Sequence, residues 1–197
     1  MANRTIRIRG VNWAAAAAVW FILCSGSTHA VSTGMPGDAS QTNRVATQTL
    51  SGSWKLAVDP ENLGRDQRWF ARIQPEAVEA PVPGVIQQVF PGYHGVAWYW
   101  HAFRFQCRPV EDDRVLLRFG AVDYLAEVWL NSVYLGAYEG GETPFEFDVT
   151  ESIRAEGDAL LAVRVLNPTH QPIDGIVLNQ TPHRNKYIRP LVTHYKT

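Results

Sequence analysis

The sequence comprises 197 residues with 18 basic and 19 acidic side chains, so its formal net charge is −1. It has no basic cluster, which argues against a protein that binds nucleic acid through phosphate contacts. Tryptophan and tyrosine are frequent, with 7 residues of each. That composition suits either the core of a β-sandwich or a surface that contacts carbohydrate.

The first 30 residues are typical of a secretory signal peptide. Arg4, Arg7 and Arg9 precede an apolar run over residues 13–24, and the segment ends at the small residue Ala30. The run is short for a membrane-spanning helix, so we expect cleavage after Ala30. Three basic and no acidic residues would be removed, which leaves 167 residues with a net charge of −4. We therefore predict a secreted or periplasmic protein with no membrane attachment.

Cleavage would leave Cys107 as a single cysteine, because Cys24 lies in the signal segment. One cysteine can form no intramolecular disulfide and no cysteine-cluster metal site. Cys107 continues the alternation of Phe103 and Phe105, so we interpret it as a small buried side chain rather than a nucleophile. The histidines show no metal-ligand spacing with acidic residues. We predict no metal site and no cofactor.

The segment after the signal is interpreted as a leader followed by one domain. Residues 31–48 are small and polar without periodicity, which indicates a flexible leader. A β-sandwich is predicted over 49–190, and an unstructured tail over 191–197. The first strand begins near Leu50, with Trp54 on the same strand face.

An excursion and an aromatic strand come next. Residues 59–80 contain Pro and Gly and are expected to form a loop with one helical turn. A turn at 91–96 then leads into a strand in which alternation places Trp98 and Trp100 on one face and Tyr99 on the other. The two tryptophans are either core packing or a platform for a sugar, and the alternation does not decide between them.

Residues 120–150 carry the densest pattern in the chain. A half-buried strand is predicted over 126–130, because apolar residues alternate along it. Asn131 and Ser132 then form a two-residue hairpin turn. A glycine-rich bend follows, and Pro144 opens the next strand, where its missing N–H does least harm.

Further alternating segments at 114–119 and 161–165 complete a series of short strands separated by turns. Helical periodicity is almost absent. The sequence therefore predicts an all-β, antiparallel β-sandwich.

The order of features from 120 to 150 resembles the N-terminal sugar-binding domain of glycoside hydrolase family 2, the family of β-galactosidases, β-glucuronidases and β-mannosidases. The residues that match the family pattern are Val122, Asp123, Tyr124, Val128, Trp129, Leu130, Asn131, Gly136, Glu139, Gly140, Gly141, Pro144, Phe145, Asp148, Val149 and Thr150. Trp54 matches the start of the family's domain. Ser132 departs from the pattern, which usually has Gly there, and a turn with positive φ tolerates serine less well.

The resemblance implies a jelly roll of the galactose-binding type that lacks its last strand or two. In the family, both catalytic glutamates lie in a barrel that follows an immunoglobulin-like domain. We therefore expect a fragment that is inactive alone and that meets carbohydrate through the domains it lacks. A stand-alone carbohydrate-binding module and a non-functional truncated relic are the alternatives.

The resemblance also sorts the candidate residues. Tyr93, His94, Trp98 and Trp100 are the candidates for contact with a sugar. The motif residues expected to be structural are Trp54, Asp123, Asn131, Gly136, Glu139, Gly140, Pro144, Phe145 and Asp148. Among these, Asp148 and Glu139 are expected to accept backbone N–H groups at neighbouring bends.

No catalytic residue is assigned. A retaining glycosidase needs two carboxyl groups about 5–5.5 Å apart. Glu146 and Asp148 are the acids that strand geometry brings to one face, about 6.5–7 Å apart, and their place in the motif favours a structural role.

Overall fold

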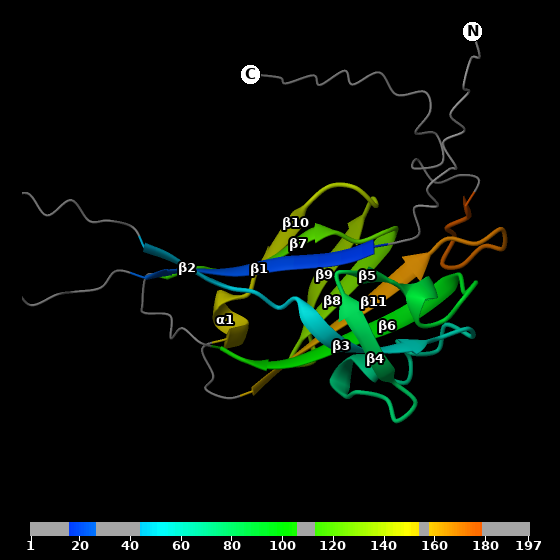
Figure 1. Cartoon of the computed structure of the whole chain (residues 1–197), viewed down its shortest axis with the longest axis horizontal. Coiled ribbons are helices and arrows are strands. Elements are labelled where there is room, and N and C mark those ends of the chain that lie inside the picture. The colour runs from blue at the N-terminus through cyan, green and yellow to red at the C-terminus, as the bar shows by residue number, and fades with distance from the viewer. Residues whose placement is uncertain (1–15, 27–43, 106–112, 154–157, 179–197) are drawn as a thin grey trace, which may run out of the picture.

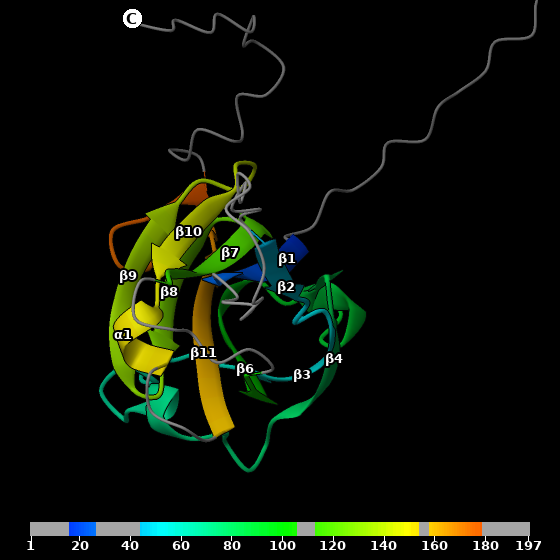
Figure 2. The same cartoon turned by 90° about the vertical axis from the view of Figure 1, so that its left-hand side faces the viewer.

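The computed structural model describes residues 16–26, 44–105, 113–153 and 158–178. In these ranges two antiparallel sheets face each other across a core (Figures 1 and 2). The prediction of an all-β antiparallel sandwich of jelly-roll type is confirmed. No helix in the described part is long and apolar enough to cross a membrane.

The larger sheet has six strands in the order β4-β3-β6-β11-β8-β9. Their bounds are Val78–Val82 for β4, Gly52–Val58 for β3, Gly95–Arg104 for β6, Asp158–Asn167 for β11, Leu125–Leu130 for β8 and Val133–Glu139 for β9. At its centre β6 and β11 pair along their whole length, from Gly95 opposite Asn167 to Arg104 opposite Asp158. This pair forms the middle of the larger sheet.

The smaller sheet has five strands, in the order β10-β7-β1-β2 with β5 also paired to β1. Their bounds are Phe145–Asp148 for β10, Val115–Ala121 for β7, Ala16–Gly26 for β1, Arg44–Gln48 for β2 and Gly84–Val85 for β5. Within the described ranges, three short helices join the strands: η1 at Trp69–Ala71, η2 at Ile86–Gln88 and α1 at Thr150–Ile153. The expected helical turn in the excursion is thus η1.

β1 lies inside the segment predicted to be a signal peptide. Its backbone pairs antiparallel with β7, β2 and β5. β2, at residues 44–48, lies inside the predicted leader, so ordered structure begins before the expected domain start at residue 49. A polar segment without periodicity forms a strand here because its pairing partner, β1, comes from elsewhere in the chain. Cleavage after Ala30 stays a prediction.

The main core fills the space between the sheets. Leu117 and Phe119 of β7 enter it from one side, and Val128 of β8 with Tyr99 of β6 from the other. The alternating apolar residues of β7 and β8 therefore face the core. The strand over 126–130 is buried on both faces rather than half-buried, because Trp129 on its outer face is also buried. Figure 2 shows the six-stranded sheet curving around this core, with α1 at one end.

A second apolar cluster lies on the outer face of the six-stranded sheet, the face turned away from the other sheet. Trp98, Trp100 and Trp129 belong to it, with Ala162 and Leu166 of β11. The excursion between β3 and β4 covers them through Trp69 and Phe70, and the segment after β11 does so through Ile173 and Ile176. Both faces of β6 and β11 are consequently buried, which explains their nearly continuous apolar sequences.

Candidate functional site

Trp98 and Trp100 are core residues. Both are 0% exposed. The indole N–H of Trp98 donates to Asp59 Oδ2 at 3.0 Å, and that of Trp100 donates to the Trp69 carbonyl at 2.9 Å. A sugar can reach neither ring, because the excursion covers them. Alternation left two interpretations of these tryptophans open, a sugar platform and core packing. The structure supports core packing.

Tyr93 and His94 lie just before β6. The Tyr93 hydroxyl donates to the Val96 carbonyl at 2.6 Å. Burial, followed by the charge of Asp59, raises the pKa of Tyr93 to about 12. The exposed His94 places Nδ1 at 3.4 Å from Oδ1 of Asn167, at the end of β11. Their contact with a sugar stays a prediction.

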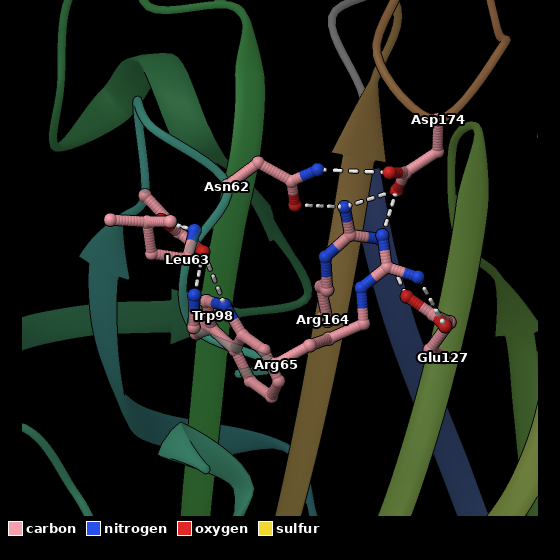
Figure 3. A network of polar contacts seen from close by, with 9 residues as sticks. Asn62, Leu63, Arg65, Trp98, Glu127, Arg164 and Asp174 are labelled. Atoms are coloured by element: carbon pink, nitrogen blue, oxygen red, sulfur yellow. Dashed lines mark hydrogen bonds and ion pairs between the residues drawn. The ribbon is translucent and has the colours of Figure 1, made fainter. Parts of the chain in front are cut away.

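A buried polar network lies on the outer face of the six-stranded sheet (Figure 3). At its centre is Arg164 of β11, whose side chain is 0% exposed. Nη1 donates to Glu127 Oε2 on β8 at 2.5 Å. Nη2 donates to Asp174 Oδ2 at 2.6 Å and to Asn62 Oδ1 at 2.5 Å. A guanidinium this deeply buried requires such partners, because desolvation of an unpaired charge costs several kcal/mol.

Arg65 completes the network from the solvent side. It forms an ion pair with Asp174 and approaches Glu127 at 3.5 Å. The Asn62 amide also donates to Asp174 Oδ1 at 2.9 Å. Two cations thus meet two carboxylates, and the segments after β3 and after β11 are held to the central strands.

Asp59 fixes the start of the excursion. Its carboxylate accepts the backbone N–H groups of Leu63 and Gly64, at 2.9 and 2.8 Å, together with the Trp98 indole N–H. A side chain at Gly64 would be excluded, because its Cβ would lie 2.4 Å from Trp98 Nε1. The loop therefore packs directly on the tryptophan, and three donors compensate the buried charge of Asp59.

The network sets the ionisation of its most exposed acid. Burial would raise the pKa of Asp174, but the Arg164 charge, the Asn62 hydrogen bond and the Arg65 charge outweigh it, so this pKa is lowered. Asp174 is therefore charged at neutral pH. Sequence reasoning missed the network, and the one available signal was Arg164 within the apolar run 160–166.

Glu139 differs from its expected role. Its Oε1 accepts the Tyr124 hydroxyl at 2.5 Å, rather than backbone donors in the glycine bend. The backbone of that bend is held separately, since the Gly140 N–H donates to the Tyr124 carbonyl at 2.9 Å. Asp123 lies against the same bend, because a Cβ on Gly141 would meet its carboxylate at 2.4 Å. These motif residues join the start of β8 to the end of β9.

Asp148 has the role expected from the motif. Its Oδ1 accepts the Thr150 N–H at 3.1 Å and the Thr150 hydroxyl at 2.6 Å. These two bonds, with a further contribution from Arg114 at 2.9 Å, lower the pKa of Asp148. Its neighbour Glu146 pairs with Arg118 at 3.1 Å. Both acids are thus engaged in local pairing.

The remaining motif residues build turns and core. Trp54 is buried and donates to the Leu50 carbonyl at 2.7 Å. Asn131 holds the β8–β9 turn, and its Oδ1 accepts the Leu160 N–H at 2.9 Å. Gly136 has φ 144° at the β-bulge, where a Cβ would lie 2.8 Å from the Phe147 ring.

Phe145 opens β10 directly after the exposed Pro144, and its ring packs between two others. Its centroid lies 4.8 Å from that of Phe119 and 4.3 Å from that of Tyr138, with both pairs stacked. The stack connects the two sheets at this edge.

Within the described ranges, no group of three His, Cys, Asp or Glu residues is arranged to hold a metal ion. Cys107 lies outside the described residues, as does the predicted tail over 191–197.

Known proteins share the motif of residues 120–150 and the sequence around it. The family model described as "Glycosyl hydrolases family 2, sugar binding domain" matches residues 47–185. The chain belongs to this family. A β-glucuronidase of Paenibacillus borealis is 32% identical over 106 residues, which cover 51% of this chain and 18% of that protein. The β-glucuronidase of Felis catus is 30% identical over 149 residues, covering 67% and 23%.

A solved structure agrees with these relatives. The β-glucuronidase of an uncultured Clostridium sp. matches with a TM-score of 0.53 and 33% identity, over 60% of this chain and 22% of that one. This family 2 chain therefore spans about a fifth of the length of the proteins it matches.

Proposed function

We propose that this chain is the non-catalytic N-terminal domain of a secreted family 2 enzyme of the β-glucuronidase type. The observation that carries the proposal is the family match over 47–185, together with relatives whose names are β-glucuronidase. The chain meets carbohydrate as part of that enzyme. Hydrolysis of the glycosidic bond belongs to residues outside these 197.

Three acids that the sequence singles out support a non-catalytic role. The motif acids Asp148 and Glu139 bond Thr150 and Tyr124, and Glu146 pairs with Arg118. A retaining glycosidase requires one carboxylate free to attack the sugar and another that can donate a proton. Side chains engaged in this way stabilise turns and strand pairs instead.

One end of the six-stranded sheet is the part we assign to the substrate entrance of the whole enzyme. β6 begins and β11 ends there, which brings His94 beside Asn167. The polar network fixes the neighbouring segments through Asn62 and Asp174. A rigid edge of this kind can support a substrate site in an adjoining domain.

The test is hydrolysis by the purified chain. Aryl β-glucuronide, β-galactoside and β-mannoside are supplied, with a complete β-glucuronidase as the positive control. We expect no release of nitrophenol above the rate in buffer. Release that persists through purification and that is lost on unfolding would overturn the non-catalytic role.

Secretion is tested separately. Residues 1–40 are fused to a periplasmic reporter, and the mass of the exported product is measured. We expect the mass that corresponds to cleavage after Ala30. Retention of the fusion in the cytoplasm at its full mass would overturn secretion and leave the family membership intact.

A further inference from the structure

An exposed aromatic surface lies at the rim of the outer face. Val133 and Tyr134 at the start of β9 are 54% and 51% exposed, the highest values among the large apolar side chains of the described residues. Tyr134 packs against Trp129, with ring centroids 5.2 Å apart. Trp129 is only 6% exposed, so it acts as a fixed base that holds the Tyr134 ring at the surface.

Phe70 extends this row of rings. It stacks on Trp129 with centroids 5.3 Å apart and an angle of 7° between the planes. The guanidinium of Arg68 lies over the Phe70 ring, 5.8 Å from its centroid. Tyr134 and Arg68 are exposed, and they rest on the buried Trp129 and the partly buried Phe70 respectively. We call these four residues the Tyr134 surface.

Arg68 is a cation without an acidic partner in the described part of the chain. Other arginines of this chain pair with carboxylates, as Arg65 does with Asp174. The φ of 57° at Arg68 places it at the left-handed start of η1, and the Phe70 ring supports its side chain. A positioned guanidinium of this kind favours a carboxylate, which it can bind through two parallel hydrogen bonds.

Polar groups border the exposed tyrosine. Burial and then the charge of Glu127 raise the pKa of Tyr134, while Arg65 opposes the increase. Glu127 lies on the same face of β8 as Trp129, two residues before it. Arg65 approaches Glu127 at 3.5 Å and remains 38% exposed at its side chain. An aromatic face flanked by fixed hydrogen-bonding groups is the arrangement that recognises a sugar ring, because one face of a pyranose is apolar and its edge carries hydroxyls.

We propose that the Tyr134 surface binds a uronic-acid-containing oligosaccharide of at least two sugar units. One sugar stacks on the open face of Tyr134, and the carboxylate of a neighbouring unit pairs with Arg68. Tyr134 and Arg68 rest on different rings of this row, Trp129 and Phe70, so two linked sugar units can contact them separately. The proposal rests on the proposed function, and it adds a binding surface outside any site of hydrolysis.

The surface is prepared for binding before a ligand arrives. Trp129 is packed against Trp98 as well as Phe70. Arg65 is held by its ion pair with Asp174. The ring beneath Tyr134 is therefore fixed before a ligand binds, which lowers the entropic cost of association.

The experiment compares two disaccharides that differ in one group. Cellobiouronic acid, which is glucuronic acid linked to glucose, and cellobiose are titrated into the 197-residue chain, and backbone amide shifts are followed by NMR. We expect millimolar binding of the uronate, weaker binding of cellobiose, and shifts in 67–70 and 133–134. Tyr134→Ala should weaken uronate binding about tenfold or more, through loss of the stacking face.

Two further variants separate stacking from charge. Arg68→Gln should remove the preference for cellobiouronic acid over cellobiose while cellobiose binding is unchanged. Arg72→Gln is the matched control, an exposed arginine four residues further along, and it should leave both affinities unchanged. Tyr134→Phe keeps the ring and should retain most of the binding, which shows that Tyr134→Ala acts through the ring face rather than through misfolding.

Several results would overturn the proposal. One is the absence of amide shifts with either disaccharide at about 20 mM, a concentration roughly 20 times a dissociation constant of about 1 mM. Binding that survives Tyr134→Ala would do the same, as would self-association of the chain that requires Tyr134. None of these outcomes bears on nitrophenol release, so failure here leaves the proposed function to its own test.

Discussion

The two sheets of the sandwich have different origins in the chain. The six-stranded sheet is built from residues 52–167, and its central strands β6 and β11 pair over their full length. The five-stranded sheet takes β1 and β2 from residues before 49. β1 lies between β7 and β2, so the smaller sheet depends on the segment that sequence predicts to be removed.

This difference shows that one apolar segment can satisfy two sets of physical requirements. A signal peptide needs a short apolar run after basic residues. A strand buried between neighbours needs a short apolar run as well. The composition of residues 16–26 meets both descriptions, whereas the alternating segments of the larger sheet fit a strand alone.

Deletion of residues 1–30 should have the largest effect on stability. β7, β2 and β5 would each lose the strand that pairs with them. The secreted form proposed above lacks residues 1–30, so we expect 31–197 to fold but to melt at a lower temperature than 1–197, because its strands lose their pairing with β1. Thermal melts of residues 1–197 and 31–197, followed by circular dichroism, provide the measurement.

A peptide of residues 16–26 supplies the control for this deletion. Added to 31–197, it should restore part of the melting temperature by pairing with β7 in the register of β1. Equal melting of the two chains without peptide would show that the smaller sheet is stable without β1.

The next effect compares one substitution in each sheet. Arg164→Met removes a fully buried cation from the larger sheet and leaves Arg65 as the cation that pairs with Glu127 and Asp174. Loss of one partner from a buried ion pair costs about 3–5 kcal/mol. Urea denaturation of the variant should show a decrease of this size in the free energy of unfolding.

Arg118→Met is the matched change in the smaller sheet. Its ion pair with Glu146 is exposed, at 48% and 43% of the two side chains. Exposed pairs contribute about 0–1 kcal/mol, so this variant should unfold almost as the wild type does. Equal losses from the two arginine substitutions would contradict the difference we infer in burial.

Low pH should reduce the electrostatic stabilisation of both sheets, and that of the larger sheet more. Asp174 and Asp148 have lowered pKa values in the folded protein. A lowered pKa contributes stability above the unfolded value, about 3.9 for Asp, and this contribution is lost as pH falls through the folded pKa. Melting temperatures should therefore fall below about pH 4.

Two variants, each with an amide in place of a carboxylate, show which aspartate causes the fall in melting temperature at low pH. Asp174→Asn should flatten the dependence of melting temperature on pH more than Asp148→Asn, because Asp174 is less exposed and contacts the buried Arg164. If Asp148→Asn instead reduced the pH dependence of the melting temperature more, the greater electrostatic contribution would lie in the smaller sheet.

Sequence reasoning predicted what local pattern determines. Alternation gave the inward faces of β7 and β8, and the Asn131–Ser132 turn was found where two residues separate two strands. The motif gave the role of Asp148 before the Thr150 contacts were known. In each case the partner lies within a few residues or on the next strand.

The features that the sequence did not predict depend on contacts between distant segments. Alternation separated Trp98 from Tyr99, yet the excursion over 59–77 decides that both faces are buried. The partners of Arg164 lie 37 and 102 residues away at Glu127 and Asn62. No local pattern encodes these distances, so the network became visible only with the fold.

The smallest effect is expected at the β8–β9 turn, where two neighbouring residues adopt the same backbone conformation for different reasons. Asn131 has φ 51° and Ser132 has φ 67°. Ser132→Gly should stabilise the protein by about 0.5 kcal/mol, because relief of the left-handed strain exceeds the extra entropy of glycine in the unfolded chain. Asn131→Gly should instead destabilise it by about 1 kcal/mol, since the Leu160 N–H loses its acceptor. Opposite signs in urea denaturation would show that the turn conformation is strained at serine and supported by a side chain at asparagine.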